Sequence, residues 1–177
     1  MVPMREKPMC KKSPETIEAE RQKTRSLYMA IGQFMFEFSQ LEFIIRHALG
    51  AALDLNETGA NAPFDIVTSP YDFITLCNVT KAIFLRTIGC EEQDRKEIED
   101  ILNACMKLNN EERVPIAHGT WFIDESGLGA RHVPRTKLDV TIKYSRISDI
   151  DAAAQKAATL RSRLIKFLCG PIPPRDL

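Results

Sequence analysis

An arginine and a histidine lie five positions apart in the middle of the chain, and together they could act on a phosphodiester. They are Arg113 and His118, in the segment 109–121. Histidine gives or takes a proton near neutral pH. Arginine keeps its charge and can hold a phosphate with two parallel N–H donors. Chemistry of this kind needs no metal ion, so we expect neither a metal site nor another cofactor.

The reaction that this pair would perform is cleavage of RNA. His118 would take the proton of a ribose 2′-hydroxyl as general base, or give one to the leaving 5′-oxygen as general acid. Arg113 would stabilise the charge that develops on the phosphate oxygens in the transition state. The product would be a 2′,3′-cyclic phosphate, and DNA should resist because it lacks the 2′-hydroxyl. The alternative is that both residues are structural: Arg113 would end a helix, and His118 would cap that helix or fill space in the fold.

The residues that follow the histidine resemble a known signature. His118 is followed by Gly119 and then by an aromatic residue, Trp121. The segment resembles the Arg-x4–6-His motif of the HEPN family in its histidine–glycine–aromatic form. HEPN domains are small helical bundles, and many are metal-independent ribonucleases of toxin and defence systems. The resemblance implies a helical fold, an endoribonuclease, a homodimer whose subunits share the cleft, and a cognate antitoxin as a partner.

The sequence departs from the family pattern directly after the arginine, where a polar residue is usual. Val114 and Pro115 stand there. Because proline disfavours helical geometry at the preceding residue, we expect the helix to end or kink near 112–114 and a short turn to restart at Pro115. Side chains five apart on a regular helix point about 140° apart, and a kink could return Arg113 and His118 to one cleft.

Two alternatives to the nuclease stay open at this point. If the proline breaks the motif, the chain would be a catalytically inactive helical interaction protein that forms a dimer. The third hypothesis is a module that binds RNA or a nucleotide through Arg113 and a basic loop without cleaving it. Salt-dependent binding would distinguish that module, because phosphate contacts weaken steeply as salt rises.

Three further residues are candidates for the site. Glu42 lies in a Leu-Glu context that HEPN-like proteins often carry, and it could hold the motif arginine in place. The alternative for Glu42 is an intrahelical ion pair with Arg46, four positions on. Arg131 and Lys137 belong to a basic loop that could contact RNA phosphates, although the loop has no interleaved aromatic residues. Trp121 is expected to pack in the core rather than to stack on a ligand.

The charges of the chain balance overall but not locally. Lys and Arg number 24, as do Asp and Glu, so there is no overall basic footprint for nucleic acid. Residues 91–112 hold eight acids and three bases, whereas residues 129–166 hold nine bases and three acids. A charge run is most often a solvated face. The alternative is that the basic stretch guides a polyanion toward the motif.

The apolar pattern predicts a mainly α fold, a helical bundle of about four main helices with a small β-hairpin before the last one. We expect helices over 13–50, 69–89, 91–110 and 148–170, and a hairpin that pairs 120–123 with 138–144 around an intervening loop. Ser-Pro pairs at 13–14 and 69–70 mark two of the helix starts. The first helix has an apolar surface broad enough to be covered on several sides, a second subunit included. One domain is expected over 13–170, with tails at 1–12 and 171–177.

The remaining composition favours a cytoplasmic protein that does not enter a membrane. The first twelve residues lack the apolar stretch of a secretory signal. No apolar run approaches the roughly 20 residues of a membrane span. The five cysteines are odd in number and form no Cys-x-x-Cys pair, so they are expected to be reduced thiols, mostly in the core.

Overall fold

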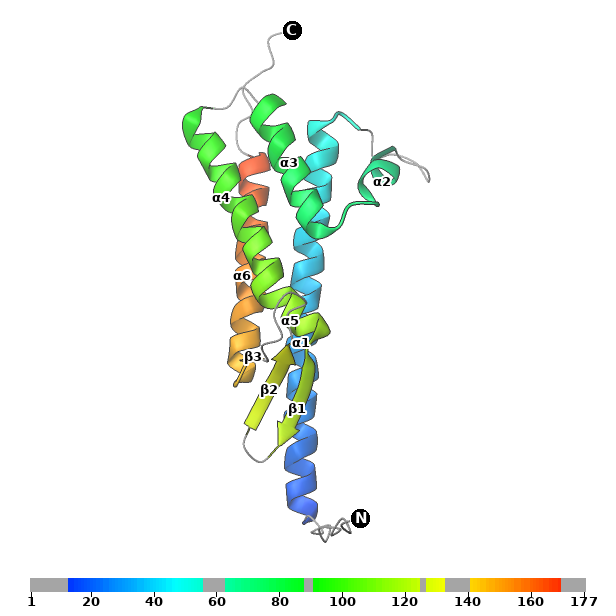
Figure 1. Cartoon of the computed structure of the whole chain (residues 1–177), viewed down its shortest axis with the longest axis vertical. Helices are drawn as coiled ribbons and strands as arrows, with labels where there is room; N and C mark the ends of the chain where they lie inside the picture. The colour runs from blue at the N-terminus through cyan, green and yellow to red at the C-terminus, as the bar shows by residue number, and fades with distance from the viewer. Residues whose placement is uncertain (1–12, 56–62, 88–90, 125–126, 133–140, 170–177) are drawn as a thin grey trace, which may run out of the picture.

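The chain forms a helical bundle with a small antiparallel sheet at one side (Figure 1). The computed structural model describes residues 13–55, 63–87, 91–124, 127–132 and 141–169, so the two expected tails lie outside it. The mainly α class with four main helices is confirmed. The elements in chain order are α1 (Pro14–Ala52), α2 (Pro63–Thr68), α3 (Phe73–Thr87), α4 (Glu92–Leu108), the π-helical segment η1 (Asn109–Arg113), α5 (Val114–His118), β1 (Thr120–Asp124), β2 (Gly127–His132), β3 (Thr141–Lys143) and α6 (Ile147–Cys169).

Helix α1 is the element along which the others pack. It begins as predicted, because Ser13 Oγ accepts a hydrogen bond from the Thr16 amide at 3.2 Å and Pro14 is the first helical residue. Its 39 residues span roughly 58 Å. In Figure 1 its N-terminal part extends past the sheet, while its C-terminal part lies beside α3 and α6.

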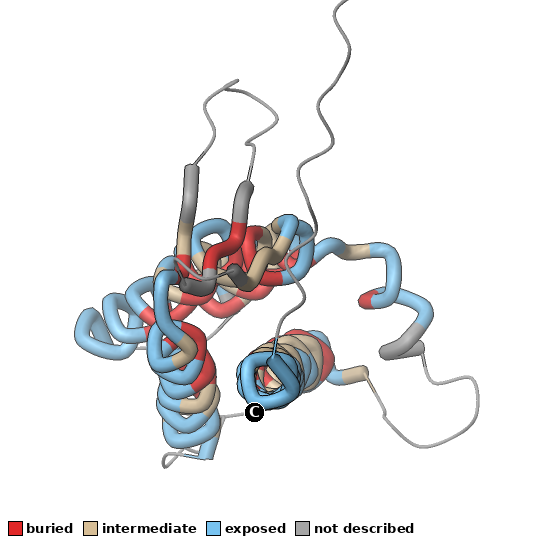
Figure 2. The backbone as a smooth tube through the Cα atoms, turned by 90° about the horizontal axis from the view of Figure 1, so that it is seen from below, coloured by how far each residue is buried: buried red, intermediate tan, exposed pale blue. Residues whose placement is uncertain are grey.

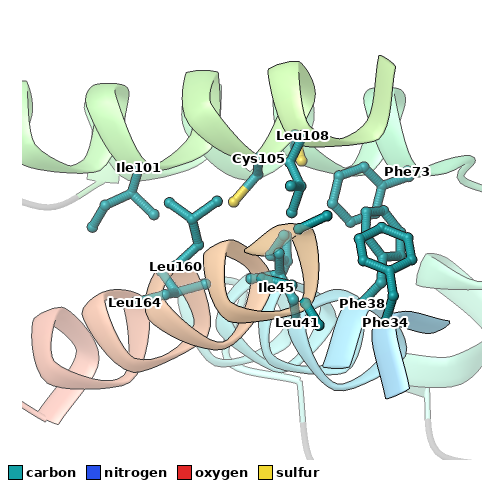
Figure 3. Close-up of a cluster of buried hydrophobic side chains, with 14 of the residues drawn as sticks. Phe34, Phe38, Leu41, Ile45, Phe73, Ile101, Cys105, Leu108, Leu160 and Leu164 are labelled. Atoms are coloured by element: carbon teal, nitrogen blue, oxygen red, sulfur yellow. The ribbon is translucent and has the colours of Figure 1, made fainter. Parts of the chain in front are cut away.

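The core fills the space between α1, α3, α4 and α6. Figure 2 shows the buried positions gathering where these helices meet. The ring of Phe38 lies 5.9 Å from that of Phe34 and 4.5 Å from that of Phe73, so three aromatic side chains join α1 to α3. Figure 3 shows α4 and α6 completing this cluster with Ile101, Cys105, Leu108, Leu160 and Leu164. Burial of this apolar surface is the main force that holds the bundle together.

Acidic side chains stabilise the first turns of α3 and α6, and α3 begins later than predicted. The second main helix, α3, begins at Phe73 rather than Ser69, because residues 69–72 connect it to α2. Asp72 caps it by accepting the Thr75 amide at 2.7 Å, and this hydrogen bond lowers the pKa of Asp72. At the start of α6, Asp149 accepts the backbone amide of Arg146 at 3.1 Å.

The sheet corrects the predicted hairpin. Its strand order is β1-β2-β3, so β1 pairs with residues 127–132, which were expected to belong to a loop, and the predicted return strand pairs with β2 instead. Two glycines make 127–132 resemble a turn. One of them, Gly129, lies opposite Phe122, where an added Cβ would stand 2.3 Å from the phenylalanine ring. The glycine therefore accommodates the aromatic ring within the strand pair.

Across the described residues, none of the helices combines the length and apolarity that crossing a membrane would require.

Candidate active site

The chain from α4 to α5 keeps helical geometry throughout, but its winding changes at η1. The amide of Val114 donates to the carbonyl of Asn109, five residues back instead of four. Pro115 has no N–H for the carbonyl of Glu111, its partner in a regular helix. The predicted kink therefore takes the form of a π-helical segment, and the expected end of the helix near 112–114 is not seen.

Arg113 and His118 meet across this segment. Arg113 Nη1 lies 3.4 Å from His118 Nε2. Arg113 is the last residue of η1 and His118 the last of α5, so the extended arginine stem has to span an axial rise of about 7.5 Å. A guanidinium can only donate, so Nε2 of His118 is the acceptor in this contact. His118 is exposed and Arg113 is half-buried, which leaves the pair open to solvent.

Gly119 ends α5 at a point where no side chain would fit. Its amide donates to the Pro115 carbonyl oxygen at 2.8 Å, and its extended backbone leads directly into β1. A Cβ at position 119 would lie 2.4 Å from that same oxygen. The glycine of the motif thus permits the tight change from helix to strand immediately after His118.

Two side chains from the sheet region donate to carbonyl oxygens of η1 and α5. Lys143 Nζ lies 2.6 Å from the carbonyl oxygen of Glu111, which in a regular α-helix would accept from residue 115, here a proline without an N–H. Trp121 Nε1 donates to the carbonyl oxygen of Ile116 at 3.1 Å. Because both contacts reach across from the sheet, they hold the altered helix against it.

Tyr144 makes a third contact, to the side chain of Glu112. Its hydroxyl donates to Glu112 Oε2 at 2.6 Å, and Lys156 Nζ lies 2.7 Å from Glu112 Oε1. Burial, followed by this carboxylate, raises the pKa of Tyr144. Tyr144 has a φ of 61°, a conformation uncommon for an aromatic residue. Its ring stacks on Trp121 with centroids 5.7 Å apart. Tyr144 and Lys156 thus hold the side chain of Glu112, the residue before Arg113.

Trp121 packs against the core, as predicted. It is a partly buried member of the apolar cluster, and its indole N–H is used within the protein.

Glu42 forms the intrahelical pair that was the alternative for this residue. Its Oε1 lies 2.6 Å from Arg46 Nη2. Arg46 also donates to the carbonyl oxygens of Tyr71, at 3.0 Å, and Thr68. The pair therefore joins α1 to the connection between α2 and α3. In the part of the chain that the structure describes, Glu42 is paired with Arg46 rather than with the motif arginine.

The two candidate RNA-contacting residues are placed only in part. The backbone of Arg131 lies in β2 opposite Thr120, which is two residues beyond His118. Its side chain and the whole of Lys137 lie outside the described residues. Arg131 thus belongs to a strand rather than to the predicted loop, and this strand runs beside the start of β1. A role in RNA binding stays a prediction for both residues.

The residues that hold the altered helix were not identified from the sequence. In the sequence, Lys143 and Tyr144 belong to a predicted strand and Glu112 to an acidic stretch. One signal did exist: a proline inside a helix leaves the carbonyl four residues earlier without its amide donor. Such a carbonyl, here that of Glu111, favours a hydrogen bond from a side-chain donor such as a lysine.

No protein-family model matches this sequence, and the comparisons with curated proteins and with solved structures find no match either. What the site does is therefore inferred from its own residues and from the resemblance of its motif.

Proposed function

We propose that this protein is a metal-independent endoribonuclease in which Arg113 and His118 act on one phosphodiester of RNA. The observation that supports the proposal is the 3.4 Å contact between the Arg113 guanidinium and His118 Nε2 on an accessible surface. A base and a permanent cation at this separation can engage neighbouring atoms of one phosphate group, as the reaction needs.

The first step follows from the hydrogen bond in the free protein. The guanidinium occupies the lone pair of Nε2, so His118 can act as a base only after Arg113 turns away. A phosphate competes for the same N–H donors and makes stronger, charge-assisted hydrogen bonds. Substrate binding would thus move Arg113 onto the phosphate oxygens and free Nε2 at the same time.

The bond changes then balance without another reactant. His118 Nε2 takes the proton of the 2′-hydroxyl, and the 2′-oxygen forms a bond to phosphorus. The bond from phosphorus to the 5′-oxygen breaks, and that oxygen leaves with a proton from an imidazolium. Arg113 stabilises the charge on the remaining phosphate oxygens. The products are a 2′,3′-cyclic phosphate and a 5′-hydroxyl.

A homodimer would supply two histidines, one for each proton transfer. This part of the proposal comes from the resemblance to HEPN ribonucleases, as do a toxin or defence role and a cognate antitoxin. Beside η1, Lys143 reaches the carbonyl oxygen of Glu111 and Lys156 pairs with Glu112, so the cation left to meet a phosphate at the motif is Arg113 itself.

The decisive experiment is cleavage of several RNAs of unrelated sequence by purified protein in the presence of EDTA. We expect 2′,3′-cyclic phosphate ends and no cleavage of matching DNA. His118→Ala should lower the rate at least about 100-fold, and Arg113→Lys should lower it strongly because lysine lacks the bidentate geometry. Arg86→Ala, an exposed arginine on α3, is the control and should cleave as the wild type does.

Intact RNA with the wild-type protein, or equal cleavage by His118→Ala, would reject the nuclease. Salt-sensitive RNA binding without cleavage would support the binding module instead. A dimer that neither binds nor cleaves RNA would support the inactive interaction protein.

A further inference from the structure

Helix α1 has a second apolar stripe on the side away from the core. Met29, Phe36 and Phe43 are 67%, 59% and 55% exposed, although each is large and apolar. They are spaced seven residues apart, so they lie along one line of the helix surface. The buried residues Phe38 and Leu41 face the opposite way, into the bundle. Exposed apolar surface arranged in this way is typical of a helix that packs against another helix.

Gly32 lies within the same stripe and leaves space there. Apart from the neighbouring backbone of α1 itself, no atom of the described residues lies within 4 Å of the position where its Cβ would be, so the described part of the fold does not need a glycine here. Glycine in a helix interior also costs about 1 kcal/mol of stability relative to alanine. A close approach by another helix is a physical reason for a small residue between Met29 and Phe36.

We propose that this stripe is the interface between two copies of the chain, packed as an antiparallel pair of α1 helices. A two-fold axis that crosses the stripe between Gly32 and Phe36 brings Phe36 of each copy over Gly32 of the other. The same axis places Phe43 beside Arg25 and Met29 of the other copy. Phe36 thus faces a glycine and Phe43 faces an arginine, so the stripe of one copy is complementary to the same stripe of the other.

Charge favours the antiparallel direction over the parallel one. Arg25 is exposed and lies on the line of the stripe. A parallel pair would bring Arg25 against its own copy, which is unfavourable. The antiparallel pair instead brings Arg25 to the ring of Phe43, whose face attracts a cation.

The area available fits a dimer. The exposed parts of Met29, Phe36 and Phe43 amount to roughly 300–400 Å² per chain. That is about half of the roughly 800 Å² per partner of a specific interface, and exposed neighbours such as Tyr28, 69% exposed, would have to contribute the rest. The proposal concerns α1 alone, and it holds whether or not Arg113 and His118 cleave RNA.

The test is the mass in solution, measured by light scattering or sedimentation across a range of micromolar concentrations. The wild type should have about twice the 20.0 kDa of one chain. Phe36→Glu should give a monomer with unchanged helical content, since the side chain is exposed. Ile165→Glu, an exposed apolar residue on α6, is the control and should stay a dimer.

Gly32→Gln separates packing between copies from folding. The added side chain enters open space in the single chain and favours the helix, so thermal stability of the dilute protein should be kept or raised. Dimerisation should nevertheless weaken at least tenfold, because the side chain fills the space for Phe36 of the other copy. Dimerisation as strong as that of the wild type would overturn the proposal, as would a monomeric wild type or a dimeric Phe36→Glu variant.

Cross-linking determines the direction of the pair. Arg25→Cys and Phe43→Cys variants, whose positions face each other in the antiparallel pair, are mixed, one of them carrying a size tag, and oxidised beside the wild type as background. A disulfide between the two variants supports the antiparallel pair. Disulfides that form only within each variant would show a parallel pair and contradict the proposal.

Discussion

Lys143 Nζ lies 2.6 Å from the carbonyl oxygen of Glu111. In a regular α-helix this oxygen would accept from the amide of residue 115, but Pro115 has no N–H. The winding of the helix changes beside this proline, which lies between the two residues of the motif, and a lysine from the sheet donates to the Glu111 carbonyl. The departure from the family pattern at this position is compatible with a site in which Arg113 and His118 still meet.

Replacement of Lys143 should loosen this arrangement without touching the motif. Lys143→Met loses the hydrogen bond to Glu111 and is expected to lower the free energy of unfolding by about 1 kcal/mol. If the protein cleaves RNA, the rate should fall while the chemical groups stay in place. Urea denaturation measures the first effect, and Lys107→Met, an exposed lysine of α4, is the matched control. Equal stability of the two variants would argue against a structural role for Lys143.

Gly119→Ala should lower the stability of the fold, because the added Cβ would clash with one backbone oxygen. Its Cβ would lie 2.4 Å from the Pro115 carbonyl, so the turn after His118 would have to open. We expect a loss of about 1–3 kcal/mol. Gly32→Ala is the opposite case, since nothing lies within 4 Å there, and it should stabilise the dilute protein by up to about 1 kcal/mol. Thermal denaturation of both variants gives the comparison, and a harmless Gly119→Ala would contradict the geometry described.

Tyr144 should make stability depend on alkaline pH. Its raised pKa means that the folded protein favours the neutral hydroxyl. The stability that Tyr144 contributes to folding is fully present below the pKa of an unfolded tyrosine, about 10. It is lost as the pH rises from there toward the higher pKa of the folded protein. Tyr144→Phe removes the hydrogen bond to Glu112 and should cost about 1–2 kcal/mol at neutral pH.

The difference between the wild type and Tyr144→Phe isolates this effect from the lysines, which titrate in the same range. Denaturation from neutral pH to about pH 11 should show the difference shrinking above pH 10. A constant difference across that range would show that ionisation of Tyr144 is not linked to folding.

The described cysteines should differ sharply in reactivity. Burial raises the pKa of Cys105 to about 12 and that of Cys77 further, whereas Cys169 is exposed at the end of α6. Iodoacetamide at pH 8 followed by peptide mapping should label Cys169 and leave Cys77 and Cys105 unmodified. All three should react once the protein is unfolded in urea. Labelling of Cys77 in the native protein at the rate of Cys169 would show that α3 opens readily.

Local signals in the sequence were sufficient for much of the fold. Ser13 and Pro14 determine the start of α1, because the cap and the proline act within one turn. The helical spacing of Phe34, Phe38 and Leu41 likewise identifies the face that the structure buries. The core position of Cys77 follows from the same pattern.

Tertiary contacts decided what the sequence left open. Whether 127–132 is a loop or a strand depends on Phe122 packing over Gly129 from the neighbouring strand. The partner of Glu42 depends on Arg46, which the carbonyls near α3 hold in place. Residue types and spacing suggested that Arg113 and His118 could work together, but they could not establish that the two side chains meet. Their contact depends on the course of the helix between them, whose winding changes beside Pro115. Lys143 and Trp121, which belong to the sheet, hold that helix in place by hydrogen bonds to its carbonyl oxygens.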